Sequence, residues 1–276
     1  MPKIKFSLLS IIGGLTLLSS SAYAGVDAEV SYILNTLLFL IGGFLVMWMA
    51  AGFAMLESGL VTSKSVATIA AKNIGLYSIA GLVFWLVGYN LAYGIPEGGF
   101  IGSFIPWSDA SSVDTGYSDG SDWFFQMVFC ATTCSIVSGT LAERIKIWPF
   151  FLFCAILAGV IYPIEMGWQW GGGHLAAAGF SDFAGSTLVH SAGAAAALAG
   201  AILLGPRLGR FTDSGEAAPM APFASSSIPL ATLGVFILWM GWFGFNGGSQ
   251  LAMGSFDDST ACLLYTSDAA DERHCV

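Results

Sequence analysis

The sequence predicts an all-α membrane protein whose chain crosses the bilayer about six times. Of the 276 residues, 55% are hydrophobic and only 10% are charged, and the mean hydropathy is +0.75. A typical soluble domain contains about 25% charged residues, so most of this surface is expected to face lipid. Apolar segments recur along the chain, and the cations fall in alternate connections between them.

The first 24 residues have the pattern of a cleaved secretory signal. Lys3 and Lys5 precede a short apolar run, and the small-residue motif Ala22-Tyr23-Ala24 follows it. We therefore predict cleavage after Ala24, with the mature domain beginning at residue 25. An uncleaved first helix is the alternative, and in both cases the chain after this point begins outside the cytoplasm.

Six segments are apolar enough to span a membrane as helices. They run near residues 33–56, 68–94, 123–141, 147–164, 186–205 and 228–252. The Gly-, Ser- and Asp-rich stretch 95–122 is predicted to be an extracellular loop. The stretch 205–227, which contains three prolines, is predicted to be the longest cytoplasmic connection.

The charges predict the orientation of these segments. Six cations lie in or beside the first, third and fifth connections: Lys64, Lys72, Arg144, Lys146, Arg207 and Arg210. The opposite connections contain acidic residues and no Lys or Arg: Glu97, Asp109, Asp114, Asp119, Glu165 and Asp182. Because cytoplasmic loops are rich in Lys and Arg, we place the N-terminus outside, in the plasma or inner membrane of the cell.

Net charge and cysteine usage exclude several classes of protein. The net charge of −9 argues against nucleic acid as a partner. Cys130, Cys134 and Cys154 lie in apolar segments without a second pair at metal-site spacing, so we interpret them as small apolar residues. No cofactor, metal site or disulfide framework is expected.

The end of the chain differs from everything before it. Residues 262–276 read CLLYTSDAADERHCV, and the stretch CLLYTSDAADE resembles the translated read-through of a transposon-type sequencing adapter. We therefore predict a truncated domain over residues 25–261 and a non-native tail over residues 262–276. On this interpretation the native protein continues beyond Ala261.

The fifth segment contains an ionisable side chain at membrane depth. His190 lies in TLVHSAGAAAALAG, and such a residue either lines a cavity or is hydrogen-bonded to a neighbouring carbonyl. The stretch before it, GWQWGGGHLAAAGFSDFAG, contains Trp168, Trp170, a triple glycine and Asp182. A Trp ring here belongs to the interfacial belt or attracts a cation. Asp182 caps the following helix or supplies negative potential.

Aromatic residues recur near the predicted outer ends of the third and sixth segments. Phe125 and Phe129 are four residues apart and share a helical face. The sixth segment ends GWFGFNGGS, with Trp242, Phe243, Phe245, Asn246 and Ser249. Such aromatic residues often serve packing alone, but Asn246 and Ser249 beside three glycines favour an exposed polar site.

Six motifs, taken in order, resemble the ammonium transporter family, which includes the Rhesus proteins. They are FAMLESGLVTSK, QMVFCATTCSIVSGTLAERIK, WGGG, SDFAGSTLVHSAGA, LGPR and GWFGFNGGS, and they cover about residues 30 to 261. The resemblance implies an eleven-helix fold of two five-helix inverted repeats, assembled as a homotrimer with one pore per subunit. This chain then corresponds to the first repeat and the first helix of the second.

The resemblance also implies roles for the motif residues. Trp170 matches the tryptophan of an external cation site, and Ser249 matches its hydroxyl partner. Phe129 and Phe245 match two stacked rings that gate the pore below that site. Asp182 matches a buried carboxylate that favours cation recruitment.

His190 matches the first of two histidines that line the pore, and the second would belong to a later helix. The implied function is transport of ammonium or ammonia, with a possible regulatory partner on the cytoplasmic face. An ammonium sensor and a neutral-gas channel are alternatives within the family. An enzyme using His190 and Asp182 as acid and base is a third alternative, and no nucleophile, cofactor loop or metal-spaced cluster supports it. A purely structural membrane protein is the remaining alternative, and the ordered motifs argue against it.

Overall fold

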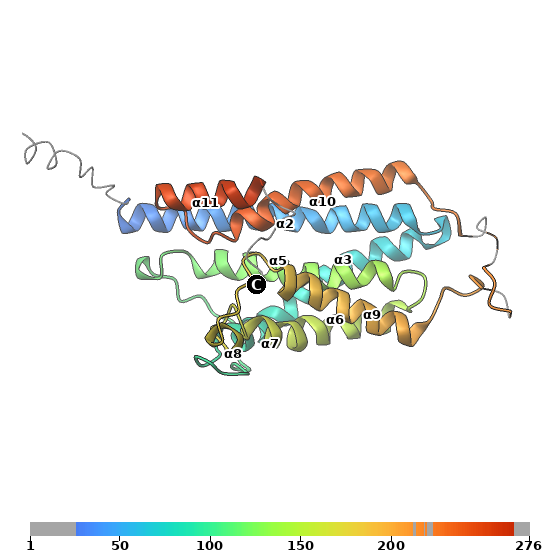
Figure 1. Ribbon diagram of the computed structural model, residues 1–276, viewed down its shortest axis with the longest axis horizontal. Helices are drawn as coiled ribbons and strands as arrows, with labels where there is room; N and C mark the ends of the chain where they lie inside the picture. Colours follow the sequence, from blue (N-terminus) through green and yellow to red (C-terminus); the bar gives the residue numbers. More distant parts are fainter. Residues whose placement is uncertain (1–25, 212–213, 218, 220–222, 268–276) are drawn as a thin grey trace, which may run out of the picture.

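The computed structural model describes residues 26–211, 214–217, 219 and 223–267, which form a bundle of helices without strands in these ranges (Figure 1). The predicted signal peptide, residues 1–24, and residues 268–276 of the predicted tail lie outside the described residues. Within the described ranges, the prediction of an all-α membrane protein is confirmed.

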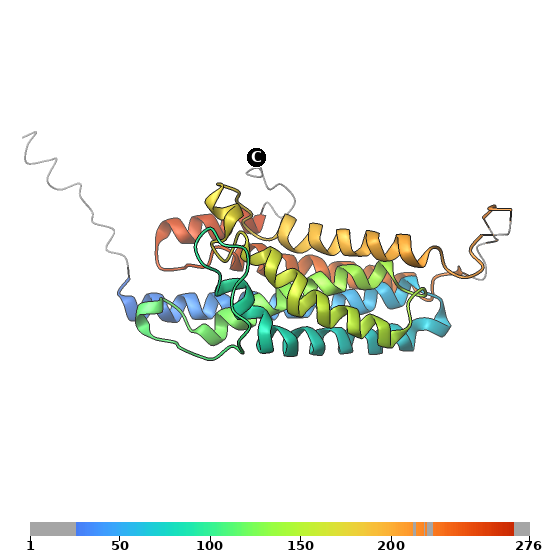
Figure 2. The same ribbon diagram turned by 90° about the horizontal axis from the view of Figure 1, so that it is seen from below.

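The longer helices run along the length of the bundle (Figures 1 and 2). They are α2 (Ala28–Leu60), α3 (Val66–Val83), α5 (Asp119–Thr140), α6 (Ile147–Ile156), α9 (Ala192–Leu204) and α10 (Ile228–Gly248). Shorter elements connect or extend them: η1 (Ser63–Ser65), α4 (Tyr89–Tyr93), η3 (Val113–Thr115), α7 (Tyr162–Gly167), α8 (His174–Ala177) and α11 (Phe256–Ser267). Three single π-helical segments lie within the spans: η2 (Phe84–Gly88), η4 (Leu157–Ile161) and η5 (Ser186–Ser191).

Five helical stretches are long and apolar enough to cross a membrane. They are Ala28–Leu60, Ser63–Tyr93, Ile147–Gly167, Ser186–Leu204 and Ile228–Gly248. Each coincides with a predicted segment. The first is longer than predicted at both ends, and at its start the Asp27 side chain caps it, accepting a 2.9 Å hydrogen bond from Val30 N. Glu165 lies in α7, at the end of a span, rather than in the connection where it was expected.

The remaining predicted segment, 123–141, is the 22-residue helix α5, which is less apolar than the other five. It packs against α2, α3 and α9, and most of its residues are buried inside the bundle. Its hydroxyls are satisfied by its own backbone, as when Thr132 donates to Val128 O at 2.8 Å and Thr133 to Phe129 O at 3.2 Å. A helix surrounded by protein needs less apolar surface than one facing lipid.

The two ends of the bundle differ in charge. We call one the α8 end; it contains α8, residues 94–118 and the start of α2 (Figure 1). The other, the α2–α3 end, contains the connections 61–65 and 141–146 and the described residues 205–211 and 223–227 of the next connection. The predicted segregation of charge is therefore present in three dimensions, since Lys64, Arg144 and Arg207 all belong to the α2–α3 end.

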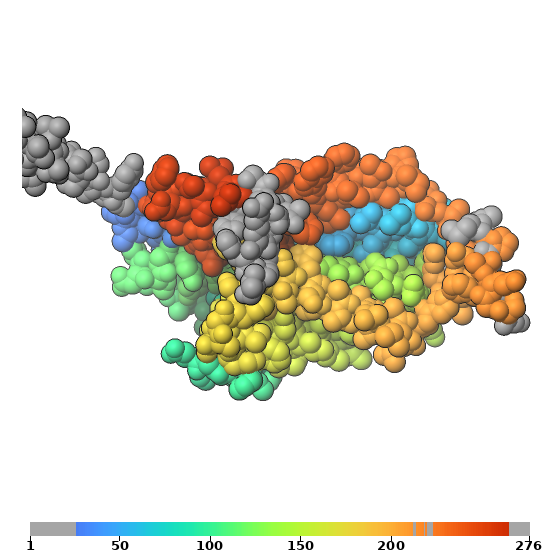
Figure 3. All heavy atoms as spheres, viewed as in Figure 1, coloured from blue at the N-terminus to red at the C-terminus, as the bar shows by residue number. Residues whose placement is uncertain are grey.

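The helix α10 pairs along most of its length with α2, and α10 and α11 form one long side of the molecule (Figure 3). The chain turns sharply after α10, and Met253 N donates to Asn35 Oδ1 at 2.7 Å. The predicted tail begins inside α11, where Cys262 Sγ contacts Gly247 O at 3.3 Å, and the helix continues to Ser267. Residues 262–267 therefore continue the helix instead of leaving the fold.

Candidate functional site

A cavity of about 420 Å³ lies at the α8 end between α2, α4, α5 and the end of α10. We call it the aromatic cavity. Its lining combines rings with a few polar groups: Phe39, Tyr89, Tyr93, Tyr117, Asp122, Phe125, Gln126, Phe129, Trp170, Phe183, Ser249 and Leu251. Concave sites of this size, mostly apolar with few polar groups, are typical of small-ligand binding.

Three of the predicted site residues meet in this cavity although they are distant in sequence. Phe129 comes from α5, Trp170 from the turn after α7, and Ser249 from the end of α10. The Ser249 hydroxyl donates to Phe245 O at 2.7 Å, and the Trp170 indole donates to Asp182 O at 2.7 Å. These bonds fix the orientation of both side chains toward the cavity.

Two stacked phenyl rings lie where α5 and α10 face each other. The centroids of Phe129 and Phe245 are 3.9 Å apart with an interplanar angle of 27°, and both side chains are 1% exposed. Trp170 meets the edge of Phe129 at 5.9 Å. Aromatic rings this close leave no room for water between them, and Phe129 is the member of the pair that lines the cavity.

His190 contacts Phe245 and is absent from the lining of the aromatic cavity. Its ring centroid is 5.5 Å from that of Phe245 and 4.9 Å from that of Trp242. The Nδ1 atom is 3.1 Å from Gly185 O. A carbonyl oxygen only accepts, so we assign the proton of the neutral ring to Nδ1 and leave Nε2 as an acceptor.

The order of aromatic side chains is therefore Trp170, Phe129, Phe245 and His190, contributed by four separate elements. His190 is half-buried within the bundle and, of these rings, contacts Phe245.

Asp182 has a local role that the structure makes explicit. It is 2% exposed, and its two oxygens accept hydrogen bonds from the backbone amides of Gly185, Ser186, Thr187 and Leu188 at 2.7–3.1 Å. The carboxylate thus caps the start of η5, one of the two alternatives considered for it. It is absent from the lining of the aromatic cavity, which it contacts through Trp170.

Two glycines allow Trp170 to reach its position. Gly185 has φ of +94°, and a Cβ there would lie 3.1 Å from the Trp170 ring and 2.7 Å from Val189. A Cβ on Gly171 would overlap the carbonyl oxygen of Ala92 in α4. The triple glycine therefore permits close approach of two backbones, which a side chain would prevent.

The other sequence-predicted residues lie around the site rather than in it. Trp168 donates to Phe100 O at 2.9 Å in the connections of the α8 end. Asn246 is buried in α10, whereas Phe243 is 43% exposed on the outside of the bundle. Phe125 lines the cavity and stacks on Phe39, with centroids 5.5 Å apart.

The sequence analysis missed several polar lining residues. Asp122 and Gln126 line the cavity beside Tyr89, whose hydroxyl donates to Asp122 at 2.5 Å. The spacing of Asp122, Gln126 and Phe129 already places them on one face of a helix. Tyr89 gives no such signal, because its contact with α5 depends on packing between helices.

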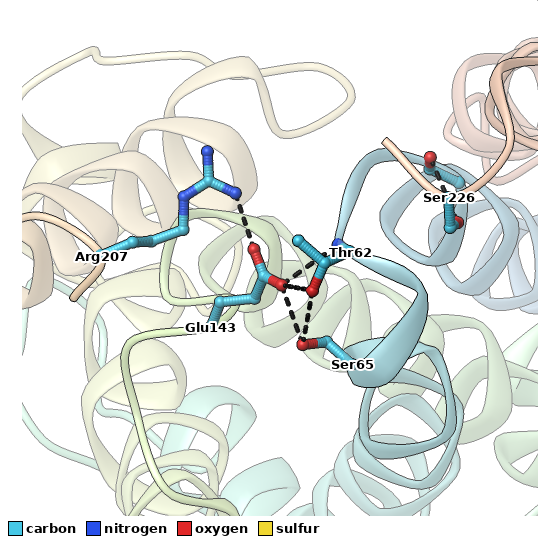
Figure 4. Close-up of polar contacts among 6 residues, drawn as sticks. Thr62, Ser65, Glu143, Arg207 and Ser226 are labelled. Carbon is cyan, nitrogen blue, oxygen red and sulfur yellow. Dashed lines mark hydrogen bonds and ion pairs between the residues drawn. The ribbon is translucent and has the colours of Figure 1, made fainter. Parts of the chain in front are cut away.

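The α2–α3 end contains a second polar site, centred on Glu143 (Figure 4). Its carboxylate accepts hydrogen bonds from Thr62 N at 3.1 Å, from the Thr62 hydroxyl, and from the Ser65 hydroxyl at 2.8 Å. Arg207 Nη1 lies 2.6 Å from its other oxygen. One side chain therefore joins all three connections at this end.

These contacts control the ionisation of Glu143. Burial acts to raise its pKa, but hydrogen bonds from Thr62, Arg207 and Ser65 outweigh burial and lower the pKa from 4.5 to about 2. The carboxylate is therefore charged throughout the physiological pH range.

A buried ion pair lies between Glu143 and the bundle centre. Lys72 Nζ is 3.2 Å from Glu57 Oε2, and each side chain is 4% exposed. The lysine also donates to Ser138 O at 2.7 Å, and the Ser138 hydroxyl donates to Glu57 at 2.8 Å. The pair thus joins α2, α3 and α5.

Among residues 26–267, apart from the few left undescribed, no three His, Cys, Asp or Glu side chains come together in a way that could hold a metal.

Comparison with known proteins identifies a family. The model of the Ammonium Transporter Family matches residues 37–270. A putative ammonium transporter of Synechocystis sp. is 42% identical over 86% of this chain and 54% of its own length. The ammonium transporter Amt2 of Archaeoglobus fulgidus is 43% identical over 77% of this chain and 47% of its own.

Solved structures agree with this comparison. A sensor Amt protein has a TM-score of 0.76 and 35% sequence identity, covering 84% of this chain and 58% of its own. Mep2 of Candida albicans has a TM-score of 0.71 and 27% sequence identity, and the match covers 86% of this chain and 53% of the length of Mep2. The chain therefore spans about half the length of the relatives it matches.

Proposed function

This chain belongs to the ammonium transporter family, and from that premise we propose that the whole protein moves ammonium or ammonia across a cell membrane. It is a multi-pass membrane protein, and the relatives named above are transporters or a sensor rather than enzymes. The observation on which the proposal rests is the stacked pair Phe129 and Phe245, of which Phe129 lines the aromatic cavity and Phe245 contacts His190.

The aromatic cavity is the proposed site of ammonium recruitment. The faces of Trp170 and Phe129 attract a small cation by about 0.5–2 kcal/mol, depending on how far it is desolvated. The Ser249 hydroxyl lines the same cavity and has lone pairs that accept a hydrogen bond. The backbone carbonyl of Asp182 accepts the hydrogen bond that holds Trp170, and its carboxylate, outside the cavity lining, contributes a negative potential that attracts the cation.

The stacked rings provide the proposed selectivity. Ammonium and potassium ions are similar in size and charge, so a site that senses only charge and radius separates them poorly. An ion that leaves water for an apolar passage is penalised heavily, whereas a neutral molecule is penalised much less. In the proposed step, ammonium releases a proton, which His190 takes up, and continues as ammonia when the gate formed by Phe129 and Phe245 opens. Potassium has no proton to release.

The proposed role of His190 is to line the path beyond the rings. With Nδ1 donating to Gly185 O, Nε2 is the acceptor nitrogen of the neutral ring, and its proposed role is to accept a hydrogen bond from ammonia or to take up a proton.

The remaining proposals concern the assembly and its orientation. The α8 end faces outside and the cation-rich α2–α3 end faces the cytoplasm, as expected if the membrane is the plasma or inner membrane. The domain comprises residues 25–261, residues 1–24 are a cleaved signal, residues 262–276 are foreign, and the whole protein forms a homotrimer. A regulatory partner would bind at the cytoplasmic face.

The test compares two histidine variants of the whole protein in a host that lacks its own ammonium transporters. His190→Phe fills the path with an apolar ring, and we expect it to abolish methylammonium uptake. His174→Phe is the matched control, because His174 stacks on Phe100 at 4.3 Å in the loops of the α8 end. Full uptake by the His190 variant would refute the proposed path.

Two alternatives within the family are separated by different measurements. A neutral-gas channel would transport without current, whereas recruitment of the cation followed by separate proton passage gives a current that saturates with ammonium concentration. A sensor would signal in response to ammonium while supporting little uptake. We favour transport because the curated relatives named above are ammonium transporters.

A further inference from the structure

The aromatic cavity contains a buried carboxylate for which the proposed pathway has no role. Asp122 is 5% exposed and lies in the same lining as Phe129, Trp170 and Ser249. It belongs to the first turn of α5, at the α8 end of the cavity. A charge at this depth costs free energy unless something compensates it.

The helix α5 presents this carboxylate and the gating ring on one face. Asp122, Phe125, Gln126 and Phe129 follow the spacing i, i+3, i+4 and i+7, and all four line the aromatic cavity. Two helical turns correspond to a rise of about 10 Å, which is the approximate distance along the axis from Asp122 to Phe129. A cation that approaches Phe129 through the cavity therefore passes the carboxylate first.

The described partners of Asp122 are uncharged. The Tyr89 hydroxyl donates to Oδ2 at 2.5 Å, and the Gln126 amide donates to Oδ1 at 3.3 Å. Both bonds fix the carboxylate, but neither neutralises it. Ion pairs in the described part of the chain join Lys72 to Glu57 and Arg207 to Glu143, both away from this cavity.

The surrounding connections supply no compensating charge either. Residues 94–121 and 168–189 contain no Lys or Arg, and the same holds for residues 246–261. A carboxylate offers about four acceptor sites. Asp122 uses two of these for its described donors, whereas Asp182 accepts four backbone amides and lies outside the lining.

We propose that Asp122 is a further cation-binding residue of the aromatic cavity, whose negative charge attracts and holds small ammonium-type cations before they reach Phe129. This inference rests on the proposed function of the cavity and adds a residue to it. A bound cation lowers the free-energy cost of keeping the Asp122 carboxylate buried, and the carboxylate in turn raises the concentration of cations in the cavity.

The experiment uses the whole protein and methylammonium as the probe. Asp122→Asn keeps the size of the side chain and one acceptor oxygen but removes the charge. We expect the KM for methylammonium uptake to rise on the order of tenfold, with the maximum rate largely retained. Asp122→Glu restores the charge and is expected to return the KM toward that of the parent.

The matched control is Asp114→Asn, which removes one exposed charge from the same end of the bundle and should leave the KM nearly unchanged. A purely structural Asp122 would behave differently: the Asn variant would lose folded protein or maximum rate while keeping the parental KM. That result, or an unchanged KM with normal yield, would overturn the proposal.

A binding measurement separates this inference from the proposed function. Tryptophan fluorescence of the purified protein is titrated with methylammonium chloride, which needs no flux. Weaker binding to the Asn variant supports the role of Asp122 even if the parent transports nothing. Equal affinity of parent and variant, or no binding by the parent, overturns it.

Discussion

The buried pair of Glu57 and Lys72 gives a quantitative prediction for stability. The two charges are 3.2 Å apart, and both side chains are 4% exposed. At that distance and an effective dielectric constant of about 20, their attraction is about 5 kcal/mol. The attraction offsets the cost of removing two charges from water, so the net contribution of the intact pair is much smaller.

Removing one partner leaves the other charge buried and uncompensated. For Lys72→Met, Glu57 keeps the Ser138 hydroxyl at 2.8 Å as a donor but loses its positive partner. We expect this variant and Glu57→Gln each to lower the free energy of unfolding by about 3–5 kcal/mol. With about 2–4 °C per kcal/mol for a chain of this size, the melting midpoint should fall by about 6–20 °C.

The double variant is the sharper measurement. It buries no charge, so its loss of stability should be smaller than the sum of the two single losses by at least about 2 kcal/mol. Thermal unfolding of the purified protein in detergent measures all three variants against the parent. Lys64→Met, which removes an exposed lysine from the same end, is the control and should change the midpoint little.

Two outcomes would refute this reasoning. Single variants that lose less than about 1 kcal/mol would show that Glu57 or Lys72 reaches water in the membrane-bound protein. Strictly additive losses would show that the two charges do not interact, whatever their distance in the structure.

Three further predictions concern the other end of the bundle and the connections. Asp182→Ala should lower stability by about 2 kcal/mol and abolish uptake, because four backbone amides lose their acceptor. Since the pKa of Glu143 is lowered from 4.5 to about 2, its stabilising contribution is complete above pH 4.5 and is lost as the pH falls toward 2. The parent should therefore lose stability in that window relative to Glu143→Gln. Gly171→Ala should destabilise by about 1–3 kcal/mol, because its Cβ would overlap Ala92 O.

Each of these has a direct check. Uptake and melting midpoints of Asp182→Ala are compared with those of Asp114→Ala, an exposed acid at the same end, and normal flux would remove Asp182 from the pathway. Parallel stability curves of parent and Glu143→Gln between pH 5 and 2 would contradict the low pKa. Gly81→Ala, where a Cβ meets only Met127 at 3.6 Å, is the control for Gly171→Ala, and equal stability of the two would refute the clash.

The sequence alone determined the helical segments and their charge segregation. Lipid requires every backbone polar group to be bonded within its own segment, so a run of apolar residues such as 228–252 is sufficient to predict a helix there. The positions of Trp170, Phe129, Phe245, Ser249 and His190 also followed from motifs in linear order. Their spacing along the chain carries no information about distances between helices.

Only the tertiary structure decided which faces of the helices meet. The stacking of Phe129 on Phe245, the cap formed by Asp182 and the pairing of Glu57 with Lys72 each depend on the rotation and lateral packing of helices. The burial of α5 and the place of Asp122 in the aromatic cavity depend on it as well. Lateral packing is set by close contacts between side chains distant in sequence, and a hydropathy pattern does not record them.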